Sequence, residues 1–216
     1  MLRRVLAAAI AAQSASVALA ATMYKISSSY LGDQCGGTPC AVYASSADSC
    51  TPSECSPGSS NIDADMQTVD CSSDFIATMR DKFGDSPYLI KLMNTDATCS
   101  KLSVAFGYPA SGACVGAYDK SYYVIASLDE SGSASVQYYN QRSCLTDDLY
   151  QTDSADETAL TQHTCSSKGY SWYSSNDVDG SSGSDSTSEV RDDMGEATAD
   201  SAPLRTSDSP WFCSCS

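Results

Sequence analysis

The sequence predicts an α+β fold dominated by strands, built from one or more small antiparallel sheet domains that are stapled by disulfides, with one amphipathic helix near residues 73–84. Three observations lead to this fold class. Short segments of alternating apolar and polar side chains, typical of half-buried strands, recur between turn-forming residues. Apolar residues at helical spacing occupy one clear segment. The chain also holds 11 cysteines and begins with an export signal.

Residues 1–20 are predicted to be a signal peptide. Arg3 and Arg4 supply the basic start, an alanine-rich run follows, and Ala18-Leu19-Ala20 has the small-x-small pattern of a cleavage site. Export places the mature chain outside the cell, where thiols become disulfides. We therefore expect a secreted, extracellular protein.

Nine cysteines in the globular region are the disulfide candidates. They are Cys35, Cys40, Cys50, Cys55, Cys71, Cys99, Cys114, Cys144 and Cys165. Because nine is odd, three outcomes stay open: one of them remains reduced, Cys213 or Cys215 returns to the globular region, or an intermolecular bridge forms.

The first half of the globular region is expected to contain two strands, a loop and the helix. Residues 23–29 and 40–45 alternate as strands do, whereas 51–70, with its prolines and serines, is expected to be an irregular loop anchored by cysteines. Within 73–83 the apolar residues share one helix face. Ser72 or Ser73 is expected to cap this helix and Gly84 to end it.

The second half is expected to consist mainly of strands. Four strands are predicted at 87–93, 102–107, 121–128 and 134–139, and the last two flank a hairpin loop. A short helix is expected around 154–161 and a closing strand at 169–174.

The predicted domain organisation is a globular region, 21–174, followed by a tail. A strand-turn-cysteine pattern ending at Cys50, Cys99 and Cys144 recurs at intervals of roughly 45–50 residues. This leaves open a division into two lobes, about 21–86 and 87–174. Residues 175–216 are rich in Ser, Asp and Gly and are expected to be a disordered acidic tail.

Charge and hydropathy exclude two classes of partner. The formal net charge is −15, and loss of Arg3 and Arg4 with the signal makes it −17. Such a polyanion repels nucleic acid. The mature sequence also lacks an apolar stretch long enough to span a membrane.

No residue pattern predicts catalysis, a metal site or a cofactor. His163 is the only histidine, and no Gly-x-Ser-x-Gly elbow accompanies it. The cysteine spacings lack the Cys-x2-Cys pairs or histidines of a zinc site. Three acidic pairs lie in polar, loop-like surroundings that would leave them ordinary ionised groups: Asp63/Asp65, Asp147/Asp148 and Asp156/Glu157. We therefore expect a non-enzyme, with a carboxylate-dependent glycoside hydrolase as the least favoured alternative.

Aromatic residues are the most suggestive binding feature, since the chain has 13 tyrosines and two tryptophans. Neighbouring residues of a strand point to opposite faces, so one tyrosine of each consecutive pair is expected to be exposed. The candidate contacts are Tyr123, Tyr139, Tyr170 and Trp172. The alternative is that these rings fill the core and pair across strands.

These features predict an extracellular binding or sensing role, with an unknown protein or glycan as partner. A protease inhibitor or host-directed effector is the alternative. In that role a loop held by cysteines, such as Cys50 to Cys71, would block the enzyme.

Several segments resemble oomycete secreted cysteine-rich proteins. The likeness lies in GTPCAVY at 37–43, DSCTPSEC at 48–55, YYVIASL at 122–128, GSASVQY at 132–138 and WYSSND at 172–177. That group includes the extracellular N-terminal regions of oomycete tyrosine-kinase-like receptor-type kinases. The resemblance spans about residues 22–180 and implies export rather than an activity, because no catalytic motif lies among the matches. Without kinase motifs in the 216 residues, a stand-alone relative and a truncated receptor ectodomain both remain open.

Overall fold

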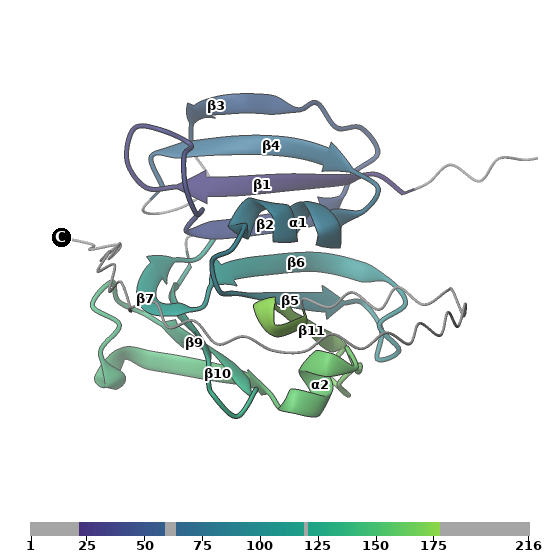
Figure 1. Ribbon diagram of the computed structural model, residues 1–216, viewed down its shortest axis with the longest axis vertical. Helices are drawn as coiled ribbons and strands as arrows, with labels where there is room; N and C mark the ends of the chain where they lie inside the picture. The colour runs from purple at the N-terminus through teal and green to yellow at the C-terminus, as the bar shows by residue number, and fades with distance from the viewer. Residues whose placement is uncertain (1–21, 59–63, 119–120, 178–216) are drawn as a thin grey trace, which may run out of the picture.

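The computed structural model describes residues 22–58, 64–118 and 121–177. Over these residues the chain forms two antiparallel sheets with a few short helices (Figure 1). The predicted strand-dominated α+β fold is confirmed. The predicted signal peptide and most of the predicted acidic tail lie outside the described residues.

The larger sheet has seven strands in the order β11-β5-β6-β2-β1-β4-β3, and all neighbours are antiparallel. Its strands are β1 (Tyr24–Tyr30), β2 (Ala41–Ser46), β3 (Ser53–Pro57), β4 (Met66–Ser72), β5 (Tyr88–Asn94), β6 (Leu102–Pro109) and β11 (Tyr170–Ser174). β2 pairs with β6, so strands from 21–86 and from 87–174 share this sheet. A boundary at 86/87 therefore does not separate the two sheets.

The smaller sheet has four strands in the order β10-β9-β8-β7. They are β7 (Ser111–Gly116), β8 (Tyr123–Leu128), β9 (Ala134–Tyr139) and β10 (Leu149–Ala155). β8 and β9 form the hairpin expected around 129–133. In Figure 1 the small sheet lies below β5 and β6 of the large one.

The helix expected near 73–84 is α1 (Phe75–Phe83). Its cap is Asp74 rather than Ser72 or Ser73, because the Asp74 carboxylate accepts the Ala77 N–H at 3.0 Å. Ser72 instead accepts the Asp74 N–H through its hydroxyl oxygen at 3.0 Å. Gly84 ends the helix with φ 55°, in the left-handed region that favours glycine.

The core has two parts, one on each face of the large sheet. Met79 and Phe83 of α1 pack against one face together with Ile90. On the opposite face, Leu89 belongs to the cluster that joins the two sheets. Adjacent residues of β5 thus serve different cores, as the two-residue period of a strand requires. Lys91 follows Leu89 at that period and therefore lies between the sheets.

Three parts of the chain differ from the sequence expectation. The range 51–70 contains β3 and β4 instead of an irregular loop. β7 and β10 were not expected, and α2 (Glu157–Thr161) begins only after β10 ends at Ala155. The short 3-10 helices are η1 (Thr146–Asp148) and η2 (Ser175–Asp177). β3 and β10 lie at sheet edges and are mostly exposed, so they lack the regular apolar alternation of half-buried strands.

Among the described residues, eight of the nine candidate cysteines form four disulfides. The pairs are Cys35–Cys55, Cys50–Cys71, Cys99–Cys165 and Cys114–Cys144. The ninth candidate, Cys40, is a buried thiol whose Sγ donates to the Ser29 carbonyl at 3.3 Å.

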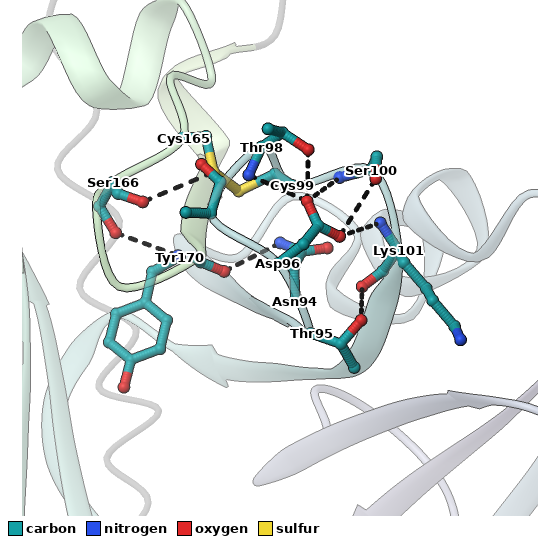
Figure 2. The surroundings of a disulfide bond; sticks show 12 residues. Asn94, Thr95, Asp96, Thr98, Cys99, Ser100, Lys101, Cys165, Ser166 and Tyr170 are labelled. Carbon is teal, nitrogen blue, oxygen red and sulfur yellow. Dashed lines mark hydrogen bonds between the residues drawn. A yellow bond between two sulfur atoms is a disulfide. The ribbon is translucent and has the colours of Figure 1, made fainter.

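The Cys99–Cys165 disulfide ties the turn after β5 to the segment before β11 (Figure 2). Asp96 holds that turn by accepting the N–H groups of Thr98 at 2.9 Å and Lys101 at 3.0 Å. Hydrogen bonds to the Thr98 hydroxyl and the Ser100 N–H lower the pKa of the Asp96 carboxyl below its usual 3.8.

The same region fixes the start of β11. The Asn94 side-chain amide donates to the Gly169 carbonyl at 3.0 Å, and the Ser166 hydroxyl accepts the Tyr170 N–H at 3.0 Å (Figure 2). These contacts set the position of Tyr170, the first residue of β11.

Candidate ligand-binding cleft

A cleft of about 340 Å³ lies between the two sheets, where β5, β6 and β11 face β9 and β10. Its volume is at the lower end of the range of about 300–1,000 Å³ typical of small-molecule sites. Its walls are largely aromatic, and the rings come from Phe106, Tyr108, Tyr122, Tyr138, Tyr150 and Tyr170. Lys91, Gln151 and Asp153 supply charged and amide groups.

The polar end of the cleft is a buried ion pair that joins the sheets. Lys91 on β5 donates through Nζ to Oδ2 of Asp153 on β10, and the two side chains are only 3% and 6% exposed. The other Asp153 oxygen accepts from the Gln151 amide at 2.8 Å. Lys91 Nζ also lies 3.4 Å from the Tyr138 hydroxyl. One charge of each sign therefore lies at this end of the cleft.

Three aromatic rings surround the Lys91 ammonium. Nζ lies 4.1 Å from the ring centroid of Tyr170, 5.5 Å from that of Tyr138 and 5.6 Å from that of Trp172. These distances lie within the range in which a ring face attracts a cation. The site thus holds its own lysine in an aromatic cage.

Burial lowers the pKa of Lys91 from its ordinary value of 10.5 because the charged form loses hydration. The hydrogen bond and the negative charge of Asp153 oppose this effect, whereas Lys168 adds to it.

Three tyrosine rings in contact with one another line the cleft, and the outermost is open to solvent. Tyr150 is 59% exposed and stacks on Tyr122, with centroids 5.0 Å apart and planes 18° from parallel. Tyr122 in turn meets Tyr138 edge-on at 6.2 Å. A ligand entering the cleft would meet the ring of Tyr150 before it reaches Lys91.

The four aromatic residues predicted as contacts lie in different places. Tyr170 lines the cleft, and Trp172 lies beside the same lysine but is only 3% exposed. Tyr139 is 5% exposed and pairs across strands with the half-buried Tyr123, as the core-packing alternative supposed. Tyr139 and Trp172 therefore offer a ligand very little surface.

The cleft uses residues that the sequence interpretation did not single out, above all Lys91, Gln151 and Asp153. One sequence signal was present: Lys91 interrupts the apolar run YLIKLM at 88–93. A charge inside a strand of this kind is rarely buried without a partner.

The histidine and the acidic pairs, which the sequence did not favour as catalytic groups, lie outside the cleft where the structure describes them. His163 is half-buried, with its ring stacked on Tyr173 at 3.9 Å and its Nδ1 2.8 Å from the Trp172 carbonyl. Asp156 caps α2 by accepting the Ala159 N–H at 2.7 Å.

The other described acidic residues of these pairs do not line the cleft either. Asp65 accepts the Gly32 N–H at 3.0 Å and Asp148 accepts from the Ser143 hydroxyl at 3.1 Å, whereas Asp147 and Glu157 are exposed. Asp63 lies outside the described residues. Over residues 22–58, 64–118 and 121–177, no three His, Cys, Asp or Glu side chains gather as a metal site would require.

Comparison with protein-family models, curated proteins and solved structures finds no match to this chain. Within the part of the chain that the structure describes, no helix is both long and apolar enough to cross a membrane. The geometry of the cleft is therefore the feature of the described residues that bears on function.

Proposed function

We propose that this chain is a secreted, non-enzymatic protein that binds an extracellular ligand in the cleft between its two sheets. The observation that carries the proposal is the buried Lys91–Asp153 pair beside a solvent-accessible, tyrosine-lined cleft. Burying two charges costs several kcal/mol of hydration per ion, and a well-packed apolar pair is often at least as stable. Supplying polar groups to a ligand gives this costly pair a function.

Two observations support an extracellular setting. The four disulfides suit an oxidising compartment. The signal-like residues 1–20 and the resemblance to oomycete secreted cysteine-rich proteins agree with it. A capture or sensing role fits that setting, whether the chain acts alone or as part of a receptor ectodomain.

The single carboxylate among the described residues of the cleft favours binding over hydrolysis. Paired-carboxylate glycoside hydrolysis places two acids roughly 5–10 Å apart. Asp153 is the one carboxylate among the described residues that line this cleft. Lys91 and Gln151 already engage its two oxygens.

The test uses the full mature protein, with its disulfides intact, in heteronuclear NMR titrations against extracellular small molecules and glycans. A true ligand should shift the Tyr122, Tyr138 and Tyr150 resonances in a saturable way. Tyr150→Ala should weaken binding, because this exposed ring lies at the mouth of the cleft. Leu145→Ala is the matched control, since Leu145 is 61% exposed and does not line the cleft. The proposal would be refuted by saturable binding whose affinity is unchanged in Tyr150→Ala and which leaves the resonances of all three tyrosines unshifted.

One observation favours a protease inhibitor as a second function. β3 is an exposed edge strand that contains Cys55 of the Cys35–Cys55 disulfide, and Cys50–Cys71 ties the segment just before it to β4. An edge strand of this kind can pair with the main chain of an enzyme groove. Titration of secreted proteases should then give inhibition that depends on both disulfides and is indifferent to Tyr150→Ala.

A further inference from the structure

We infer that the ligand of this cleft is an uncharged sugar ring, within a neutral oligosaccharide. This inference deepens the proposed function and rests on it. It follows from three properties of the described cleft: its ring faces, its hydrogen-bonding groups and its charge.

The first property is an exposed aromatic ring face in the cleft. Sugar rings carry C–H groups on their faces, and those faces pack on flat aromatic side chains while the hydroxyls point outward. Tyr150 presents an exposed ring whose position is fixed by its stack on Tyr122. Such a ring offers a large contact area at a low cost in side-chain freedom.

The second property is a set of neighbouring hydrogen-bonding side chains. Gln151 and Asp153 lie two residues apart on β10, and their side chains touch on the cleft side. Together with Lys91 they place an amide, a carboxylate and an ammonium side by side. Neighbouring hydroxyls of a sugar can both donate to such a group and accept from it. A purely apolar ligand would make no use of the hydrogen-bonding capacity that these groups keep after pairing with one another.

Charge is the third property. Lys91 and Asp153 are the only charged residues among those lining the cleft over the described chain, and they neutralise each other. An anionic ligand would gain little from a lysine already paired, and it would approach a chain of net charge −15. A cationic ligand would find the Tyr170 ring face already occupied, because the Lys91 ammonium lies 4.1 Å from its centroid. A neutral ligand meets neither obstacle.

The experiment titrates the mature protein with matched hexasaccharides. The neutral probes are the β-1,4-glucose, β-1,3-glucose and N-acetylglucosamine hexamers. The charged probes are the galacturonic acid hexamer and the glucosamine hexamer. At least one neutral probe should bind saturably, shift the cleft tyrosines and exceed both charged probes in affinity by about tenfold or more.

Variants then locate the binding. Tyr150→Ala and Gln151→Leu should each lower the affinity for the neutral probe about tenfold, and both sites are exposed enough to spare the fold. Leu145→Ala should leave that affinity unchanged.

The outcomes separate the inference from the proposed function. If a charged probe or a non-sugar ligand binds in the cleft and is lost on Tyr150→Ala, the sugar class is overturned while ligand binding by the cleft stands. If a neutral hexamer binds but both cleft variants retain full affinity, the sugar inference is refuted for this site. If no sugar or other molecule shifts the cleft tyrosines, both proposals are wrong.

Discussion

Removing one member of the Lys91–Asp153 pair should destabilise the fold far more than removing both. The two side chains are 3% and 6% exposed, so Lys91→Met leaves the Asp153 carboxylate buried without its counter-charge. Such a single replacement costs about 3–5 kcal/mol. Asp153→Leu should cost a similar amount, because it leaves the Lys91 ammonium buried without its counter-charge. The double variant Lys91→Met/Asp153→Leu should come within about 1 kcal/mol of the wild type, since a buried pair and an apolar pair are often nearly equal in stability.

An exposed pair on the same molecule provides the control. Lys82 Nζ lies 2.6 Å from the Asp70 carboxylate, but these side chains are 22% and 36% exposed. Pairs in contact with solvent typically contribute about 0–1 kcal/mol. Lys82→Met should therefore change the free energy of unfolding by no more than that.

Urea unfolding with the disulfides intact, followed by far-UV circular dichroism, measures all four variants and gives the coupling energy of the buried pair. That coupling should be several kcal/mol for Lys91 and Asp153. A loss of stability in Lys91→Met no larger than that in Lys82→Met would refute the prediction. So would a double variant whose loss equals the sum of the two single losses, because the two positions would then not be coupled through the ion pair.

Three further predictions concern pH and the disulfides. Burial lowers the folded-state pKa of Lys91 below 10.5, so the unfolded chain binds more protons between those two values. The contribution of Lys91 to the free energy of unfolding should therefore rise with pH in that window. Urea titrations at several pH values should show this rise in the wild type and its absence in the Lys91→Met/Asp153→Leu variant. Asp96 gives a pH dependence of the same sign in the acid range: its folded-state pKa is also lowered, so its stabilisation is present above pH 3.8 and is lost as the pH falls through that lowered value. Acid unfolding followed by circular dichroism should lose this contribution in Asp96→Asn, and an unchanged acid profile would contradict it. Replacing Cys99 and Cys165 by Ala removes a disulfide between residues 66 apart in sequence and should lower the free energy of unfolding by about 4 kcal/mol. The same replacement of Cys35 and Cys55, which are 20 residues apart, should lower it by about 3 kcal/mol. Urea midpoints in the reverse order would count against loop closure as the source of the stability.

Elements with a regular apolar period could be predicted from the sequence. α1 has its apolar residues on one face and Gly84 at its end, and both signals are local. β3 and β10 could not be predicted in the same way, because most of their side chains are exposed at sheet edges. What defines those strands is backbone pairing with β4 and β9, and this pairing leaves little trace in hydrophobicity.

The disulfide pairing could not be deduced either, although the candidates were evident. Spacing alone does not select partners among nine cysteines. The partners are set by the sheet order, which brings the turn after β5 beside the segment before β11 and so joins Cys99 to Cys165.

The cleft shows why a candidate binding site between two sheets is harder to predict than the sheets themselves. Strand alternation places Tyr138 and Tyr139 on opposite faces, but the sequence prediction named Tyr139 as the contact, whereas Tyr139 is buried and Tyr138 lines the cleft. It does not say which of the two faces is covered by the core and which borders a cleft. That choice depends on where the second sheet lies, and Asp153, which defines the polar end, is 62 residues from Lys91 in sequence. Lys91 in its apolar strand is therefore a local signal whose meaning appears only when β10 is placed opposite β5. A lysine or other charged residue within an apolar strand segment is accordingly a good starting point for locating such a site. Its partner should be sought on strands with mostly polar side chains, which hydrophobic patterns do not identify.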